Sequence, residues 1–188
     1  MRKTLFILMS LVLVMLPAVA FSDLVQNGGF ETGDFTSWTQ SGNTGFTGVA
    51  GGPHSGSFAA FFGPIGSLGF LSQDLTTVVG EAYDLSFWLQ NDGGTPSVFE
   101  VIWDAITIFN ISNPPSFPYT LESFSSLIAT SSPTHLTFGF RQDPAFFRLD
   151  DVSVTGATAA VPEPATMLLL GSGLIGLAGY WRKKFIKK

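Results

Sequence analysis

The sequence of 188 residues contains no cysteine, and outside its two ends it contains very few cations. The absence of cysteine excludes disulfide bonds and thiol chemistry, so the chain depends on a hydrophobic core or a structural metal for its stability. Between residues 21 and 160 the only basic side chains are Arg141 and Arg148, against 13 acidic ones, which gives this segment a net charge of −11. About 140 residues with a high phenylalanine content are enough for one core, and we expect a single domain.

The shortage of positive charge excludes a nucleic-acid partner, because no basic surface is available to neutralise phosphates. It also disfavours attachment of this segment to an anionic membrane surface. Divalent cations and neutral polymers are the partners that such an acidic surface tolerates.

Histidine is also scarce: the chain has only His54 and His135, and they have no metal-binding spacing. No nucleophile elbow, zinc-binding histidine pair or phosphate-binding loop is present. We therefore expect a protein that is not an enzyme, and we interpret both histidines as structural or solvated. A polysaccharide hydrolase with two paired carboxylates remains an alternative, although 13 acidic residues produce chance pairs.

The N-terminus has the pattern of a secretory signal. Arg2 and Lys3 precede an apolar stretch, Leu5 to Leu16, and Ala18 and Ala20 form the small-x-small pattern that signal peptidase accepts. The sequence predicts a signal peptide over residues 1–20, export through the Sec translocon, and a mature chain that begins at Phe21. A retained N-terminal anchor is the alternative, and the short apolar stretch disfavours it.

The C-terminus has a second apolar run, residues 165–181, followed by a basic tail, residues 182–188. Seventeen residues form roughly 26 Å of helix at about 1.5 Å per residue, which is at the short limit for crossing a bilayer. We predict a transmembrane helix in the inner membrane with its basic tail in the cytoplasm. The small, unpatterned residues 155–161 are predicted to be a flexible linker.

A short motif precedes this apolar run: Val161, Pro162, Glu163 and Pro164. Together with the glycines of the run and the basic end, residues 162–188 resemble the PEP-CTERM sorting signal. That resemblance implies a bacterial exported protein whose tail is cut by an exosortase-type enzyme close to Glu163, and an association with exopolysaccharide or biofilm matrix. A plain anchor that is never cut is the alternative.

The middle of the chain has the pattern of an all-β domain, with short alternating runs separated by Gly, Pro, Asn and Asp. The clearest predicted strand is 81–90, in which Tyr83, Leu85, Phe87 and Leu89 share one face. Eight or more strands at this spacing predict a two-sheet sandwich or jelly roll. The further predicted strands are 24–26, 58–62, 70–75, 99–103 with Ile106 and Ile108 after it, 119–128, 136–140 and 146–154.

The two ends of this region, residues 21–154, carry a looser resemblance. Asn27-Gly28-Gly29-Phe30-Glu31 at the start, and a last strand with Asp150-Asp151-Val152, resemble carbohydrate-binding-module and galactose-binding-like jelly rolls. This resemblance implies a jelly-roll fold, and many exported domains share it without a demonstrated ligand.

That fold commonly holds a structural calcium ion where the first and last strands meet. The resemblance implies Glu31 and Asp150, or else Asp151, as carboxylate ligands, with backbone carbonyls near Gly29; calcium prefers such oxygen ligands. Surface or turn positions for these acids are the alternative. Strict alternation would place Asp150 on the same face as Val152, pointing inward, unless a bulge intervenes.

Trp88 is the candidate for ligand contact, because it lies among polar residues on the face of its strand opposite the apolar one. Sugars stack their CH faces on flat aromatic rings, while amides and carboxylates bind their hydroxyl groups. Gln90 and Asp92 offer those groups, and Arg141 or Arg148 could add a donor. An aromatic side chain covered by a loop is the alternative.

We therefore predict an exported, non-catalytic cell-surface or matrix protein. A carbohydrate-binding module with a specific glycan site around Trp88 is the second hypothesis.

Overall fold

A computed structural model of the protein describes residues 22–156. The predicted signal peptide with Phe21, and the chain from residue 157 to the C-terminus with the sorting motif, the apolar run and the basic tail, lie outside the described residues. Within residues 22–156 the chain forms ten strands, and no helix there is long and apolar enough to span a membrane.

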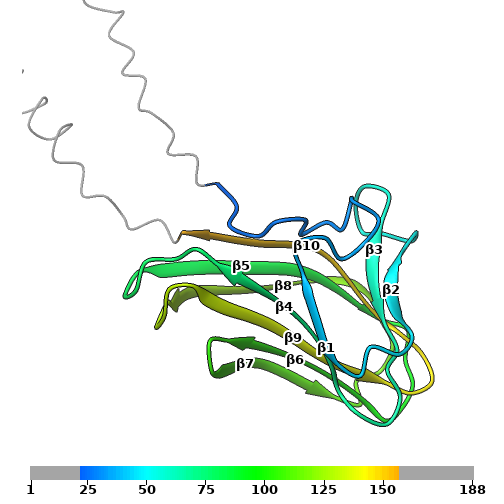
Figure 1. Ribbon diagram of the computed structural model, residues 1–188. Coiled ribbons are helices and arrows are strands. Elements are labelled where there is room, and N and C mark those ends of the chain that lie inside the picture. The colour runs from blue at the N-terminus through cyan, green and yellow to red at the C-terminus, as the bar shows by residue number, and fades with distance from the viewer. Residues whose placement is uncertain (1–21, 157–188) are drawn as a thin grey trace, which may run out of the picture. The chain divides into compact units, whose positions relative to one another are not determined.

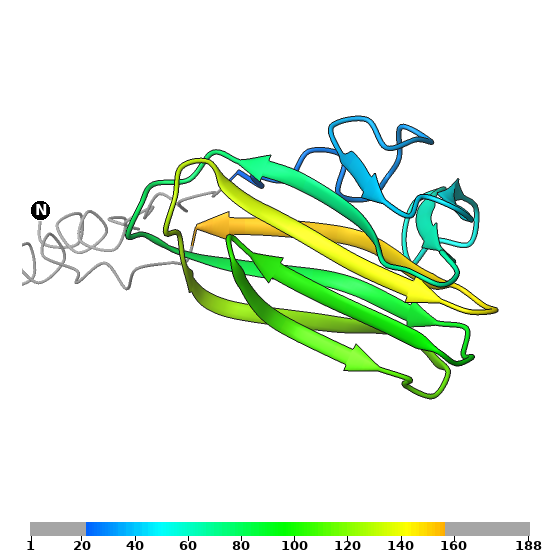
Figure 2. The same cartoon turned by 60° about the horizontal axis from the view of Figure 1, so that its bottom comes forward.

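The strands form two antiparallel sheets of five strands each, packed face to face (Figure 1, Figure 2). This arrangement confirms the predicted all-β sandwich. The first sheet has the order β1 (Thr39–Gly42), β4 (Gly69–Leu75), β9 (Thr134–Gln142), β6 (Ser97–Trp103) and β7 (Ile106–Ser112). The second sheet has the order β2 (Thr47–Ala50), β3 (Ala59–Phe62), β10 (Phe147–Gly156), β5 (Ala82–Asn91) and β8 (Phe117–Ile128).

The core between the sheets is built from alternate residues of each strand, most of them aromatic or leucine. In β5 every second side chain is buried, as the alternation in the sequence predicts. Phe62 of the second sheet stacks on Phe140 of the first, with ring centroids 3.9 Å apart. The largest fully buried side chains are Phe30, Phe62, Phe87, Phe99, Phe138, Phe140, Phe147, Leu71, Leu75, Leu85, Leu89 and Leu136.

A bulge in β10 decides where its acidic residues point. The register between β10 and β5 shifts between Asp150 and Ser153, and Asp151 has a positive φ of 48°. Leu149 before the bulge and Val152 after it are both buried in the core. Because the bulge absorbs one residue, Asp150 lies on the outer face of the second sheet beside Trp88, its register partner.

Three local predictions differ from the structure. Residues 24–26 form no strand, because Gln73 binds the backbone of Gln26 through both ends of its side-chain amide, at 2.8 and 3.0 Å. The short strands β1 and β2 were not predicted, since their residues are mostly exposed and show no apolar alternation. Strand β10 continues through Gly156, two residues into the predicted linker.

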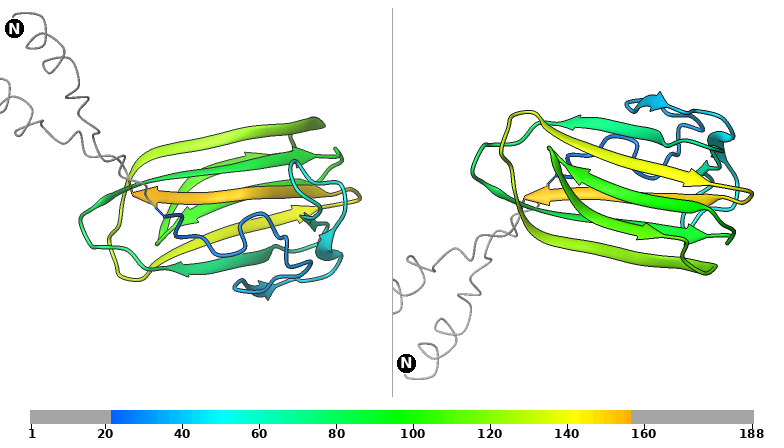
Figure 3. Two further views of the ribbon diagram at one scale, coloured as in Figure 1. Left: turned by 90° about the horizontal axis from the view of Figure 1, so that it is seen from above. Right: turned by 90° about the horizontal axis from the view of Figure 1, so that it is seen from below.

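The described chain begins and ends at the same end of the sandwich (Figure 3). The backbone amide of Leu24 donates to the carbonyl of Val154 at 2.9 Å, and the amide of Val154 donates to Asp23 Oδ1 at 3.0 Å. We call this end, with the β4–β5, β6–β7 and β8–β9 loops (residues 76–81, 104–105 and 129–133), the tether end.

Candidate functional site

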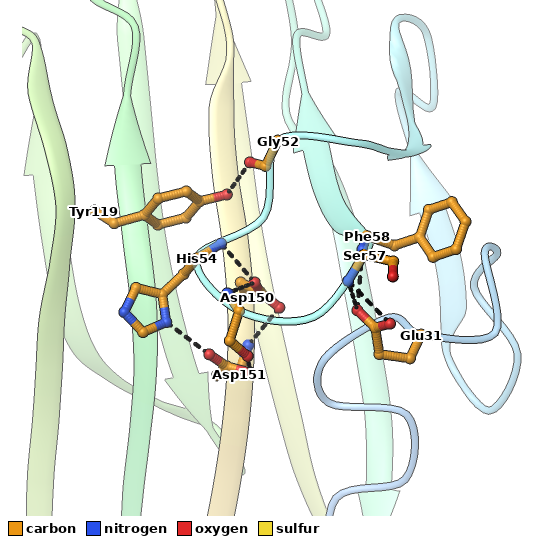
Figure 4. Close-up of polar contacts among 9 residues, drawn as sticks. Glu31, Gly52, His54, Ser57, Phe58, Tyr119, Asp150 and Asp151 are labelled. Carbon is orange, nitrogen blue, oxygen red and sulfur yellow. Dashed lines mark hydrogen bonds and ion pairs between the residues drawn. The ribbon is translucent and has the colours of Figure 1, made fainter.

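A loop, residues 51–58, crosses the outer face of the second sheet, and we call it the strap (Figure 4). Asp150 holds its middle: Oδ2 accepts the backbone amides of His54 at 2.8 Å and Ser55 at 3.1 Å. The other oxygen of Asp150 accepts the amide of Asp151 at 2.8 Å. One buried carboxylate therefore joins the strap to β10.

Glu31, from the N-terminal segment, holds the end of the strap. Its carboxylate accepts the amide of Ser57 at 2.8 and 3.1 Å and the amide of Phe58 at 3.0 Å (Figure 4). Gly56 has a φ of 67°, and a Cβ at this position would lie 2.3 Å from Glu31 Oε1. Only glycine therefore allows the backbone to approach this carboxylate so closely.

His54 closes the strap over the sheet. Its imidazole stacks on the indole of Trp88, with centroids 3.6 Å apart and planes inclined by 12°. Its Nδ1 lies 2.7 Å from Asp151 Oδ2, and Tyr119 packs edge-on at 5.7 Å. The hydroxyl of Tyr119 donates to the carbonyl of Gly52 at 3.0 Å, which fixes the start of the strap.

Burial makes this region unfavourable for negative charge. Loss of solvent contact raises the pKa of Asp150, and the backbone amides that it accepts oppose this effect only in part. Burial, followed by the charge of Asp150, raises the pKa of Tyr119 to about 12, so Tyr119 is a neutral donor at pH 7. A cation in this region would relieve the cost of the buried carboxylate.

The residues predicted to bind calcium do lie together in the structure. A Cβ at Gly29 would lie 3.5 Å from Asp151 Oδ1, 3.9 Å from Asp150 Oδ1 and 3.7 Å from Glu31 Cγ. Within residues 22–156, however, no three His, Asp or Glu side chains are grouped as metal ligands. A calcium ion here would therefore have at most two carboxylates as ligands and would need backbone carbonyls to complete its shell, and calcium remains a prediction.

The strap contains a serine, a histidine and a nearby aspartate, but their contacts do not activate a nucleophile. Ser55 Oγ donates to Asp151 Oδ1 at 2.8 Å, while His54 Nδ1 contacts the other oxygen of the same carboxylate. A serine nucleophile needs the imidazole itself as the acceptor of its proton. These three side chains therefore hold the loop in place.

Four of the predicted ligand-contact residues, Trp88, Gln90, Asp92 and Arg148, share the outer face of the second sheet. Trp88 has one ring face covered by His54, and Gln90 donates to Asp92 Oδ1 at 2.8 Å. Arg148 Nε lies 3.6 Å from Asp92 Oδ2. Arg141 does not belong to this group: it lies on β9 of the first sheet, between the buried Phe140 and Gln142, and it pairs with Asp143 at 2.9 Å. Its side chain faces outward on the opposite side of the sandwich.

A recess on the outer side of the first sheet was not predicted. It has a volume of about 480 Å³ and is lined mostly by amide, hydroxyl and carboxylate side chains. Asp74 and His135 are cross-strand partners there, and His135 Nδ1 lies 2.5 Å from Asp74 Oδ1. We call it the polar recess, and its lining residues are Gln26, Ser37, Thr39, Ser72, Gln73, Asp74 and His135.

Sequence reasoning missed the role of His54 as well as the recess. Trp88 is 34 residues away from His54 along the chain, and the strap shows only a glycine-rich composition. The recess combines an N-terminal loop with β1, β4 and β9, and no spacing in the sequence indicates that these segments meet. No signal in a single sequence could have found either one.

Comparison with known proteins finds a sorting motif in the C-terminal tail and structures with a similar fold. Residues 160–184 match the PEP-CTERM protein-sorting motif, so the chain carries this sorting signal and is an exported protein. No curated protein matches the sequence.

Several solved structures, including carbohydrate-binding modules, have a similar two-sheet sandwich. TmCBM61 in complex with β-1,4-galactotriose is 19% identical, with a TM-score of 0.59, and the match covers 72% of this chain and 99% of that one. The CBM22-1 xylan-binding domain from Paenibacillus barcinonensis Xyn10C is also 19% identical, with a TM-score of 0.51 and coverage of 76% and 99%. A cleaved adhesin domain of Lys-gingipain from Porphyromonas gingivalis is 16% identical, with a TM-score of 0.55 and coverage of 72% and 100%. At these identities the likeness shows the fold alone.

Proposed function

We propose that this protein is a non-catalytic, polysaccharide-binding domain that its sorting tail delivers outside the inner membrane. The observation that carries the proposal is the polar recess on a sandwich of the carbohydrate-binding-module type. The acidic, cysteine-free domain also suits a neutral polymer better than an anionic one, because its surface repels negative charge.

The chemistry of the recess fits the hydroxyl groups of a sugar. Carboxylate, amide and hydroxyl side chains both accept and donate hydrogen bonds, as sugar hydroxyls do. Its volume of about 480 Å³ lies within the ordinary range for ligand sites. Asp74 lines the recess with an exposed side chain beside His135, so it can also accept hydrogen bonds from a ligand.

Hydrolysis is a weaker hypothesis for the same recess. Glycoside hydrolysis uses two carboxyl groups about 5 to 9.5 Å apart on either side of the scissile bond. Among the residues that line the recess, Asp74 is the single carboxylate. This donor set supports binding of a glycan without its cleavage.

The outer face around Trp88 is the second candidate location. Trp88, Gln90 and Asp92 lie there with Arg148, and Leu121 beside Trp88 is 50% exposed. The ring of His54 already occupies one face of the indole, which leaves less of Trp88 for a sugar. For this reason we place the ligand in the recess first.

The sorting tail gives the proposed site of action. An exosortase-type enzyme would cut near Glu163 and release the sandwich to the cell surface or the extracellular matrix. A polysaccharide-binding domain released there would associate with exopolysaccharide or biofilm matrix.

Affinity electrophoresis through gels that contain neutral bacterial exopolysaccharide, galactan or xylan tests the proposal. We expect at least one polymer to retard the protein. Asp74→Ala should weaken retardation about tenfold, since a hydrogen bond to a charged group contributes about 1.5–3 kcal/mol. Ser72→Tyr, which places a larger side chain in the recess, should weaken retardation by a similar factor. Glu81→Ala, an exposed acid at the tether end, is the matched control and should behave as wild type. If Trp88→Ala abolishes retardation and the recess substitutions do not, the binding site lies on the outer face of the second sheet. No retardation by any polymer would contradict the proposed function.

A further inference from the structure

Four large aliphatic side chains are exposed together at the tether end. Val78 is 63% exposed, Val79 59%, Ile106 58% and Ile128 49%. They come from the β4–β5 loop, the start of β7 and the last residue of β8, which lie at one end of the sandwich (Figure 1, Figure 3). Several exposed aliphatic side chains on neighbouring segments at one end of a domain are typical of an interaction surface.

The backbone beneath these side chains is well fixed, so their exposure is not that of a loose loop. The amide of Gly80 donates to the carbonyl of Ala129 at 2.9 Å, and the amide of Ala129 donates to the backbone carbonyl of Glu81 at 3.0 Å. The hydroxyl of Tyr83 accepts the amide of Val78 at 2.8 Å, and Trp103 Nε1 donates to the carbonyl of Ile128 at 3.0 Å. The fold therefore holds the aliphatic groups outward.

The charge of the tether end restricts the kind of partner that it can bind. The three loops contain Glu81 and Asp104 and no lysine or arginine. The carboxylate of Asp104 is turned to its own neighbours, accepting the hydroxyls of Thr130 and Ser131 at 2.6 and 2.7 Å. A surface with aliphatic tips and no cations suits uncharged or zwitterionic lipid better than anionic lipid.

The length of chain that follows indicates the partner. Strand β10 ends at Gly156, and the apolar run of the sorting tail begins at Ala165, nine residues later. Nine residues span at most about 30 Å when fully extended. Strand β5 alone, with ten residues, is about 33 Å long, so the opposite end of the sandwich is one domain length farther from the attachment point.

We propose that the tether end rests on the outer leaflet of the inner membrane, with Val78, Val79, Ile106 and Ile128 among zwitterionic lipids, while the sorting tail is still in the bilayer. This inference rests on the tail and is independent of the polysaccharide site. It makes the uncut protein a membrane-seated domain with its far end directed away from the lipid, and cutting of the tail removes the main attachment.

The absence of native cysteine allows a direct test on the full chain. In nanodiscs of phosphatidylcholine, Val79→Cys would carry an environment-sensitive fluorophore, and Ile65→Cys, 54% exposed at the far end, would carry it as the matched control. We expect the emission from position 79 to shift to shorter wavelength in nanodiscs relative to detergent-free buffer, and to be quenched when doxyl-labelled lipid is added. Position 65 should show neither the shift nor the quenching. Ile128→Cys should repeat the result at position 79, and adding Val78→Ser and Val79→Ser should reduce the quenching at position 128.

Three outcomes would overturn the proposal. Equal quenching at positions 79 and 65 would mean that the tether end has no preference for lipid. A probe at position 79 that is shielded from water but not quenched by doxyl lipid would indicate a second copy of the chain as the partner. A probe at Ser172→Cys in the apolar run that escapes quenching would show that the tail does not enter the bilayer. None of these outcomes bears on retardation by polysaccharide, so the two proposals fail separately.

Discussion

The imidazole of His54 lies flat on the indole of Trp88, with their centroids 3.6 Å apart, and the same imidazole contacts Asp151 at 2.7 Å. This single side chain thus joins the strap to two strands of the second sheet, β5 and β10. The contact covers the tryptophan that the sequence offers as a sugar platform, and it gives the glycine-rich loop a defined position.

Removal of this contact should loosen the strap. We expect His54→Ala to lower the free energy of unfolding by about 2 kcal/mol, because an aromatic stack and a hydrogen bond to a carboxylate are lost together. In thermal unfolding followed by circular dichroism this corresponds to a decrease in Tm of about 6 °C. His135→Ala removes a histidine from an exposed pair with Asp74, and should change stability by less than about 0.5 kcal/mol. Equal effects of the two substitutions would contradict the role given to His54.

Asp104 gives a prediction of pH dependence. Desolvation, the largest single effect, raises its pKa, but the bonds from Thr130, Ser131 and the amide of His135 together lower the pKa to about 2. Because the pKa in the folded state lies below the unfolded value of about 3.9, the stabilisation is present above pH 4 and is lost as the pH falls toward 2.

Asp104→Asn should therefore be about 1 kcal/mol less stable than wild type at pH 7, after allowance for solvent screening, and the difference should shrink between pH 4 and pH 2. Urea unfolding at a series of pH values measures it. Glu81→Gln, which changes an exposed acid in a neighbouring loop, is the control. Its difference in stability from wild type should not shrink between pH 4 and pH 2. A constant difference down to pH 2 would show that the charge of Asp104 does not stabilise the fold.

Calcium should stabilise the domain if Glu31 and Asp150 hold it with carbonyls near Gly29. An ion bound at a hundred times its Kd stabilises the folded state by about 2.7 kcal/mol, and would also relieve the buried carboxylate of Asp150. We expect the Tm to fall when a chelator is added to wild type and to be insensitive to the chelator in Glu31→Gln. No change in wild type would mean that the backbone amides of the strap satisfy both carboxylates without a metal ion.

The sequence predicts those parts of the fold that depend on apolar alternation. Strand β5 shows it in ten consecutive residues, and it appears in the structure within one residue of its predicted bounds. Strands β1 and β2 contribute no buried face, so alternation cannot find them. Alternation alone would point Asp150 inward unless a bulge intervened. The structure has that bulge, and the carboxylate lies outside the core.

The strap could not be predicted, because its contacts join carboxylates to backbone amides. Any residue type supplies an amide, so the sequence of the loop carries no mark of its partner. His54 and Asp150 are 96 positions apart, and the hydrogen bond between them becomes visible only in the fold. The polar recess has the same origin, since its seven lining residues come from separate segments that the two-sheet topology brings together.

The mass and location of the protein in its own host test the account most directly. We predict that fractionation followed by mass spectrometry finds a chain that begins at Phe21 and ends near Glu163, outside the inner membrane. Replacement of Pro162, Glu163 and Pro164 by alanine should keep the chain uncut in the membrane fraction. An intact chain of 188 residues in the cytosol would contradict the account.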